Sequence, residues 1–264
     1  MYSKYELYEA SVQDPQAEVE FWQQASQELR GKPVRSMRED FCATFWNAAT
    51  WVKQHHDNTA VAVDISEDVL DYGKKKHFNQ LSSSEQSRLH VIQGDVMKVN
   101  DPKVDMVTVS NFSIFFFKER QKLLAYLKKT LSVINDNGFI CVDVLGGTQS
   151  EDDDYEEREF NIPGHKEDIT YVWEQEAYNP ITRETKYSIH YKFKNKKKMK
   201  RAFTYDWRMW SIPELKDLML EAGFKDVVIY WEEDDEDGEG SGVYSRHDDA
   251  ENCASWIAYV IGLK

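Results

Sequence analysis

The sequence has no glycine between Gly31 and Gly73, no closely spaced cysteine pair and no long apolar run. Its three cysteines, Cys42, Cys141 and Cys253, are too few and too far apart to indicate a disulfide framework or a zinc site, which suits a reducing compartment. No apolar stretch approaches the ~18 residues that would span a bilayer. We therefore expect a cytoplasmic protein that contacts no membrane.

Positive charge is also scarce: 33 Lys and Arg stand against 47 Asp and Glu, a net charge of −14. Such a surface repels polyanions, so nucleic acid is not an expected partner. The acidic residues concentrate at 151–157 and 232–240, which we expect to be solvated loops. The one basic patch, 194–201, is expected to be a hairpin tip. No histidine pairs with cysteine or aspartate at a typical ligand spacing, so we expect no metal site.

What the chain does have is an alternation of apolar strands and amphipathic helices over its first 145 residues. We expect strands at 33–37, 60–66, 89–96, 104–111 and 138–145, and helices at 15–30, 43–56, 67–77 and 118–134. Alternation of this kind predicts an α/β fold with a parallel, doubly wound sheet. Such a sheet binds ligands at the carboxyl ends of its strands.

The pattern changes in the second half of the chain. Between roughly 165 and 211, three stretches rich in aromatic and β-branched residues predict an antiparallel β insertion. A helix at 212–224 and strands at 225–232 and 253–263, separated by an acidic loop, are expected to close the fold.

Two acidic residues end successive expected strands: Asp64 the second and Asp95 the third. In a doubly wound sheet these ends face one crevice. A carboxylate after the second strand can accept both hydroxyls of a ribose, and one after the third can accept from an adenine amino group. Either acid alone is more simply a cap, as Asp64 would be for a helix beginning at Ser66. The two together, in order, favour a nucleoside site.

At this point the sequence resembles the class I S-adenosylmethionine-dependent methyltransferases. Residues 38–45 resemble the first loop of a bacterial-type subfamily in which that loop reads like "REDFCGTG", and the likeness covers nearly the whole chain. The segments that carry it are "REDFCATF" (38–45), "AVAVDIS" (60–66), "QGDVM" (93–97), "VDMVTVSNFSIFFF" (104–117), the opening "YELYEASVQDP" (5–15) and the tail from 201 to 232.

The resemblance implies a Rossmann-like, seven-stranded sheet whose last strand is antiparallel, and S-adenosylmethionine as the cofactor. It implies that Asp64 holds the ribose hydroxyls and that Asp95 and the backbone of Val96 hold the adenine. It implies Arg38 at the methionine carboxylate and Ser110 and Asn111 on the methionine and methyl-donor side. Further cofactor contacts are expected from Cys42, Ala43, Thr44 and Ile65.

The change of pattern along the sequence also suggests how the chain is divided. We expect an N-terminal lid and helix over 1–31 and a cofactor-binding α/β core over 32–150. The antiparallel insertion would then occupy 151–211, and the rest of the core 212–264.

The first loop differs from the family pattern, because Ala43 and Phe45 stand where the family has glycines. In a dinucleotide enzyme this would be serious, since backbone N–H groups must approach a pyrophosphate. S-adenosylmethionine has no phosphate, and Ala43 adds only one methyl group. A Phe45 ring that points outward leaves the pocket open, whereas a ring that points inward fills the space of the methionine moiety. Glycine loss also removes the residue that best tolerates a positive φ.

Residues for the methyl acceptor come from two regions. Tyr5 and Tyr8, at helical spacing, are candidates for a lid and for catalysis. In the insertion, Tyr205 and Trp207 share one strand face and Arg208 lies on the other, while Arg201 is a second possible clamp for a substrate carboxylate. Tyr205 and Arg208 are further catalytic candidates. The simpler interpretation is that the aromatic side chains pack the insertion onto the main sheet.

Three functions compete. The first is S-adenosylmethionine-dependent methyl transfer to a nitrogen or oxygen of a small molecule, although a basic protein substrate also suits the charge. The second is a catalytically inactive relative that binds a ligand or partner, which the altered loop would support. The third, a nicotinamide-dependent oxidoreductase, lacks the G-x-G-x-x-G motif.

Overall fold

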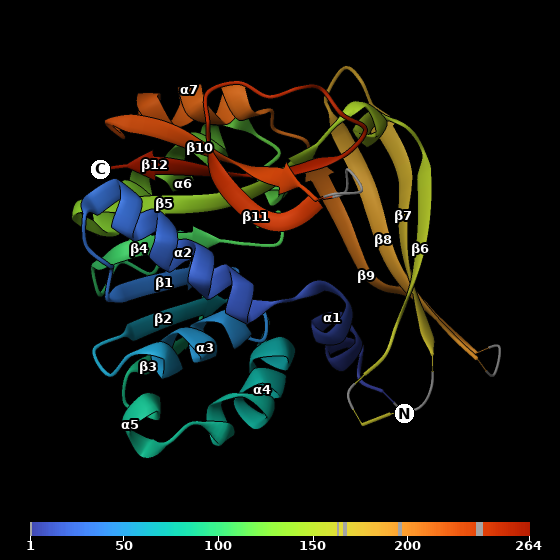
Figure 1. The fold of residues 1–264 in the computed structure, drawn as a ribbon, viewed down its shortest axis with the longest axis horizontal. Helices are drawn as coiled ribbons and strands as arrows, with labels where there is room; N and C mark the ends of the chain where they lie inside the picture. Colours follow the sequence, from blue (N-terminus) through green and yellow to red (C-terminus); the bar gives the residue numbers. More distant parts are fainter. Residues whose placement is uncertain (1, 163, 166–167, 195–196, 236–239) are drawn as a thin grey trace.

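The computed structural model describes residues 2–162, 164–165, 168–194, 197–235 and 240–264 (Figure 1). Its helices are α1 (Lys4–Val12), α2 (Pro15–Arg30), α3 (Trp46–Gln54), α4 (Glu67–Lys76), α5 (Ser83–Gln86), α6 (Arg120–Val133) and α7 (Ile212–Ala222), with short 3-10 turns η1 (Phe78–Gln80), η2 (Ser113–Phe116) and η3 (Thr148–Glu151). None of the helices in these ranges is both long enough and apolar enough to cross a membrane.

The main sheet has eight strands in the order β11-β10-β12-β5-β4-β1-β2-β3. Its strands are β1 (Ser36–Asp40), β2 (Thr59–Asp64), β3 (Leu89–Gln93), β4 (Val104–Val109), β5 (Ile134–Gly146), β10 (Asp226–Asp234), β11 (Gly240–His247) and β12 (Trp256–Leu263). Strands β1 to β5 pair in parallel, and β12 is antiparallel to both of its neighbours, β5 and β10. This is the expected Rossmann-like arrangement with one antiparallel strand, extended by an eighth strand.

Helices cover both faces of the main sheet. Helices α2, α3 and α4 bury side chains such as Trp22, Trp51 and Leu70 in one hydrophobic cluster. Helices α6 and α7 bury Leu127, Leu215 and others in a second cluster on the opposite face. The two-sided burial explains why the central strands read as continuous apolar runs in the sequence.

Two acidic stretches that were expected to be solvated loops contribute strands in the structure. The stretch expected as an acidic loop continues β10 to Asp234 and contributes β11, while residues 236–239 lie outside the described ranges. The acidic stretch 151–157, expected to be solvated loop, runs into strand β6 (Asp154–Phe160). Both β6 and β11 are edge strands, where charged side chains can remain in water while the backbone pairs on one side.

The antiparallel insertion is a separate four-stranded sheet, ordered β6-β7-β8-β9, that stands beside the main sheet (Figure 1). Its other strands are β7 (Ile169–Asn179), β8 (Glu184–Phe193) and β9 (Lys198–Arg208). The expected basic hairpin tip falls on the β8–β9 connection, of which residues 195–196 lie outside the described part.

Helix α1 lies between the main sheet and the second sheet (Figure 1). Leu7 is fully buried in a cluster with Ile169 and Tyr191 of the second sheet. On the other side, Glu9 Oε1 lies 2.6 Å from His77 Nε2, just after α4, and both side chains are buried. These contacts hold α1 over the carboxyl ends of the central strands.

Strand β1 begins and ends later than expected, at Ser36–Asp40 instead of 33–37. Arg38, Glu39 and Asp40 looked like the polar start of a loop, yet their exposed fractions are only 1%, 3% and 1%. Burial of Arg38 and Asp40 is tolerated because their charges are paired: Arg38 Nε donates to Asp40 Oδ1 at 2.6 Å, and Tyr126 Oη donates to Asp40 Oδ2 at 2.8 Å. Glu39 accepts from the Ala48 N–H at 3.1 Å, and burial raises its pKa to about 8. The loop therefore begins only at Phe41.

Candidate active site

The loop after β1 adopts a glycine-like backbone without glycine. Phe41, Ala43 and Phe45 have φ values of 58°, 47° and 48°, in the left-handed region that disfavours residues with a Cβ. Such residues cost on the order of 1 kcal/mol or more each and need support from their surroundings. The Cys42 N–H donates to Val63 O at 3.0 Å, and the Ala43 N–H donates to Asp64 Oδ2 at 2.9 Å. These bonds join the loop to the end of β2.

The Phe45 ring lies behind this loop. It is fully buried in the cluster below α3 and α4, and it packs edge-on against His77 with ring centroids 6.4 Å apart. A Cβ placed on Gly73 of α4 would come within 2.6 Å of Phe45 Cε1, so the missing side chain of Gly73 makes room for the ring. Of the two orientations considered for Phe45, the structure has the outward one.

Asp64 is the last residue of β2, and the residue that follows it, Ile65, has a solvent-exposed apolar side chain. Its carboxylate accepts from the Ala43 N–H through Oδ2 and from the Ser66 N–H through Oδ1, at 2.9 Å each. Partial burial raises the pKa of Asp64, and the backbone bonds oppose that rise. The next side chain, Ile65, is 73% exposed. The end of β2 thus offers the Asp64 carboxylate and, at the next residue, the exposed apolar side chain of Ile65.

The loop after β3 holds Asp95 and Val96. Asp95 Oδ1 accepts from the Met97 N–H at 2.9 Å, and Oδ2 lies 3.5 Å from Lys98 Nζ. Val96 is buried, and its carbonyl accepts from Arg38 Nη2 at 3.0 Å. The Asp95 carboxylate remains partly exposed.

The position of Arg38 differs from the expected one at the methionine carboxylate. Its side chain is 1% exposed, with Nε on Asp40, Nη2 on Val96 O and Nη1 on Val99 O at 2.6 Å. The guanidinium is therefore engaged inside the protein, and the expectation that it meets a methionine carboxylate is wrong. Its contacts instead brace the loop after β3 against β1.

The turn after β4 is held by a carboxylate that the sequence reasoning missed. Asp143 of β5 is 6% exposed and accepts from the Asn111 N–H at 2.6 Å and the Phe112 N–H at 2.8 Å. Asn111 and Phe112 both have positive φ, so the bonds stabilise a strained turn. Burial, followed by the charge of Glu18, raises the pKa of Asp143 well above its usual range. In the sequence, Asp143 could have been recognised as a site candidate because it is the single acidic residue within the apolar strand 138–145.

A cavity of about 520 Å³ opens beside this turn, between the main sheet, α1, α2 and the second sheet. It brings together four predicted site residues: Tyr8, Asn111, Tyr205 and Trp207. Its charged lining residues are Asp14, Glu18, Asp143, Asp154, Glu156, Glu157 and Arg158. Its aromatic lining residues are Tyr8, Phe21, Phe112, Tyr171, Trp173, Tyr187, Tyr205, Trp207, Tyr244 and Tyr259.

The tyrosines proposed for the lid occupy different places. The hydroxyl groups of Tyr8 and Tyr205 hydrogen-bond to each other, and burial raises the pKa of both well above the usual value, so both are neutral near pH 7. Tyr5 does not line the cavity; its ring packs 5.2 Å from that of Tyr72. Burial, then the charges of Asp68 and Asp64, raise the pKa of Tyr5, which puts Tyr5 on the Asp64 side.

Arg201 and Arg208 do not line the cavity, and their expected role as substrate clamps stays a prediction. Arg201 is 62% exposed and donates from Nη2 to Glu176 Oε2 at 2.7 Å. Arg208 stacks on the Trp210 ring at 3.7 Å and donates from Nη1 to Lys118 O at 3.1 Å, facing α6 and α7. The alternation along β9 puts Arg208 on the face opposite Tyr205 and Trp207.

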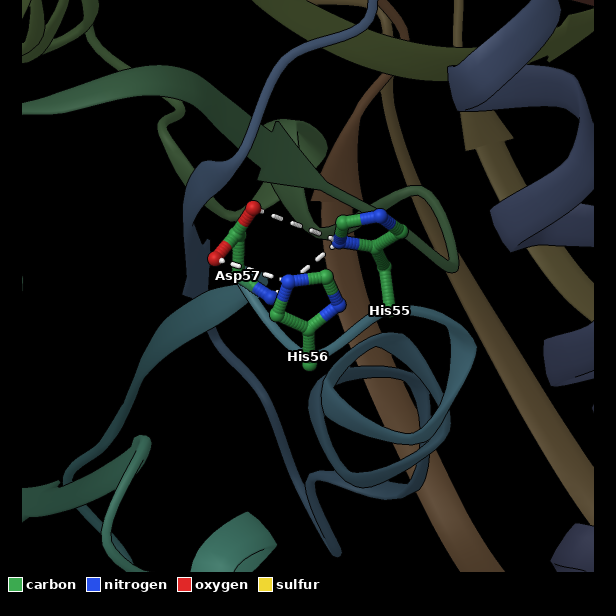
Figure 2. Close-up of side chains that lie close together, drawn as sticks. All are labelled: His55, His56 and Asp57. Atoms are coloured by element: carbon green, nitrogen blue, oxygen red, sulfur yellow. Dashed lines mark hydrogen bonds and ion pairs between the residues drawn. The ribbon is translucent and has the colours of Figure 1, made fainter.

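One group of side chains has the composition of a metal site. His55, His56 and Asp57 offer ligand atoms within 4.8 Å of one another on the turn after α3 (Figure 2). His55 Nδ1, however, already accepts from the Asp57 N–H at 3.1 Å, and Arg88 Nη1 donates to His55 O at 3.0 Å, which puts a positive charge on the same turn. His56 and Asp57 are 81% and 62% exposed. We assign no metal to this turn.

Comparisons with known proteins identify the domain and the fold that carry these residues. Residues 42–141 match the family model described as "Methyltransferase domain". That segment runs from the loop after β1 to the middle of β5, and so includes Asp64, Asp95 and Asn111. No curated protein sequence matches the chain significantly.

Several solved structures share the fold over nearly the whole chain. An S-adenosylmethionine-dependent methyltransferase from Clostridium acetobutylicum has 15% identity and a TM-score of 0.70, covering 98% of this chain and 97% of that one. The amino pentose methyltransferase CalS10 from Micromonospora echinaspora, solved with S-adenosylmethionine, has 11% identity and a TM-score of 0.69, with the same coverage.

The sugar N-methyltransferase KedS8 from Streptoalloteichus has 15% identity and a TM-score of 0.66, covering 98% of this chain and 92% of that one. At these identities the likeness establishes the fold, including the second sheet beside the main one. The chain thus has the Rossmann-like methyltransferase fold along its length, with a methyltransferase-domain match over residues 42–141.

Proposed function

We propose that this protein transfers a methyl group from S-adenosylmethionine to an amine of a small molecule bound in the cavity. The observation that carries the proposal is an acidic, aromatic cavity that begins at the turn after β4, at the same edge of the main sheet as the strand ends that bear Asp64 and Asp95. The methyltransferase-domain match and the similarity to sugar and amino pentose methyltransferases support it.

We place the cofactor across the ends of β1 to β4. The Asp64 carboxylate would accept the ribose hydroxyls, and Asp95 with the Val96 backbone would contact the adenine, against the exposed side chain of Ile65. S-adenosylmethionine supplies a methyl group on a positively charged sulfur, whose departure as a neutral thioether needs no acid. The residues present fit S-adenosylmethionine, because this cofactor has no phosphate group that the glycine-free loop after β1 would need to approach closely.

The methionine end would lie along the loop after β1 and the turn after β4. Cys42, Ala43 and Thr44 would contribute mainly backbone groups, and Ser110 and Asn111 would line the methyl side. Thr44 Oγ1 is buried and has no hydrogen-bond partner among the described residues, which leaves one polar atom of the loop for a ligand. Asn111 connects the two halves of the site, since it also lines the cavity.

Replacing Phe45 with leucine is expected to leave the affinity for S-adenosylmethionine within about twofold of the wild type. The ring lies behind the loop, so its loss removes core packing and not a cofactor contact. Unfolding free energy should fall by about 1–2 kcal/mol, as for other buried truncations of this size. Calorimetric titration and thermal unfolding measure the two effects. Markedly tighter binding by the variant would show that the ring obstructs the pocket.

The lining of the cavity favours an amine over a hydroxyl as the acceptor. It carries six carboxylic side chains against one arginine, and Arg158 is already stacked 4.6 Å from the centre of the Tyr171 ring. An amine that arrives as an ammonium ion gains from those of the carboxylic side chains that are ionised and unpaired, and from cation–π contacts of about 0.5–2 kcal/mol each. A hydroxyl group gains neither. The volume suits a ligand the size of a sugar or a small aromatic amine.

Two matched pairs of probes test the acceptor class: D-glucosamine with D-glucose, and tyramine with its alcohol analogue, tyrosol. We expect a tritiated methyl group from S-adenosylmethionine to appear on an amine of at least one pair, at no less than tenfold the rate for its alcohol. Methylation of the alcohols at equal rates, or of neither amine while the cofactor binds, would contradict an amine acceptor. The inactive-relative hypothesis predicts binding without methylation of any probe.

A further inference from the structure

Glu18 lines the cavity and, among the described residues, has one carboxylate oxygen without a hydrogen-bond partner. It lies on the first turn of α2, which begins after the N-cap Asp14, and it is one of the residues that line the cavity. Tyr259 Oη of β12 donates to Glu18 Oε1 at 2.9 Å and so fixes the side chain. Oε2 is buried and has no hydrogen-bond partner in the described part of the chain. A buried carboxylate oxygen without a partner is costly, and a bound donor would satisfy it.

The other carboxylates of the cavity differ from Glu18 in their partners. Asp143 uses both oxygens on the N–H groups of the turn after β4. Asp14 caps α2 through the Ala17 N–H at 3.2 Å, and Glu157 pairs with Lys192. Asp154 and Glu156 lie on the edge strand β6, and the Asp154 side chain accepts from the Tyr155 N–H at 2.7 Å. Within the described lining, Glu18 alone combines an anchored oxygen with a buried oxygen that lacks a partner.

In the described part of the chain, the groups that show a resolved electrostatic interaction with Glu18 are negative or neutral. They comprise Asp14 on α2, Tyr259 on β12, Tyr244 on β11, Asp143 and Cys141 on β5, and Glu39 on β1. Burial raises the pKa of Glu18 to about 7, the Tyr259 bond lowers it, and the charge of Asp14 raises it. A carboxyl group poised near neutral pH can both take and release a proton under the same conditions.

We propose that Glu18 is the base that takes the proton from the acceptor amine before methyl transfer. This inference rests on the proposed function. The ammonium ion gives one proton to Glu18 Oε2, which frees the nitrogen lone pair. The N–C bond then forms as the C–S bond breaks, and that electron pair stays on sulfur. The products are the N-methylammonium ion and the neutral thioether, and Glu18 returns its proton to water.

Glu18→Gln tests this role, since glutamine keeps the shape and takes no proton. With the better amine probe, we expect kcat/KM at pH 8 to fall at least tenfold, within the range of general-base catalysis, while the Kd for S-adenosylmethionine stays within twofold. The rise of wild-type kcat/KM through about pH 7 should be lost, because that rise follows deprotonation of Glu18. Glu20→Gln, at an exposed position on the same helix, is the matched control and should behave as wild type.

Tyr259→Phe separates a proton-transfer role from a structural one. Loss of its hydrogen bond removes a stabilisation of the Glu18 carboxylate, so the rise in kcat/KM should move to higher pH. An unchanged pH profile in both Glu18→Gln and Tyr259→Phe, with an amine still methylated, would overturn the role of Glu18 and leave the proposed function intact. Absence of cofactor binding or of methylation by the wild type would instead overturn the proposed function.

Discussion

Replacing Gly73 with alanine is expected to lower the unfolding free energy by about 3 kcal/mol and to weaken cofactor binding at the same time. The added Cβ would lie 2.3 Å from Thr44 O and 2.6 Å from Phe45 Cε1, far inside contact distance, and one of these atoms is backbone. Helix α4 cannot accept the methyl group unless the loop after β1 moves. A Tm lower by about 6 °C or more should accompany the loss of stability.

Gly94→Ala is the matched control, because the nearest atom to its added Cβ is Val99 Cγ2 at 3.5 Å, an ordinary contact. Its unfolding free energy should stay within about 1 kcal/mol of wild type. Wild-type stability in Gly73→Ala would mean that the Phe45 ring does not lie against α4. The claim that the ring leaves the cofactor pocket open would then lose its basis.

Asp64→Ala should raise the Kd for S-adenosylmethionine by at least 100-fold. Two charge-assisted hydrogen bonds to ribose hydroxyls, at about 1.5 kcal/mol or more each, correspond to a change of that size. The substitution also frees the Ala43 and Ser66 N–H groups, so the loop that borders the site loses its anchor. Calorimetric titration measures the affinity, and circular dichroism checks that the variant remains folded.

Asp68→Ala removes the same charge from an exposed position one turn further along the chain, at the start of α4, and should change the Kd by less than threefold. Asp95→Ala should give an intermediate loss, because it removes contacts to the adenine only. Equal affinities for Asp64→Ala and Asp68→Ala would show that Asp64 does not hold the ribose.

The alternation of apolar strands and amphipathic helices was enough to predict the α/β class and most elements of the main sheet. Its failures have one physical cause: a strand is defined by backbone pairing, which side-chain polarity does not report. Strand β1 ends in three buried polar residues because Asp40 finds a partner at Tyr126, far along the chain. Strands β6 and β11 are acidic because edge strands keep one side in water. The expected division into four parts stays a prediction.

The strand-end rule placed Asp64 and Asp95 at one edge of the sheet, because parallel strands present their carboxyl ends together, and the resemblance added Asn111. Their roles toward a cofactor stay predictions. The rule does not extend to arginines, since a long side chain can fold back to partners that the sequence does not reveal, as Arg38 does. Glu18 was missed because an acid on the first turn of a helix is ordinarily a partner of the helix dipole.

Calorimetric titration of the wild-type protein with S-adenosylmethionine tests the central claim most directly. The geometry of the loop after β1, with the Phe45 ring turned toward α4, predicts one site per chain with a Kd in the micromolar range. NADH should produce no binding heat, because the loop lacks the glycines that a pyrophosphate requires. No heat and no thermal shift with millimolar S-adenosylmethionine would contradict the account.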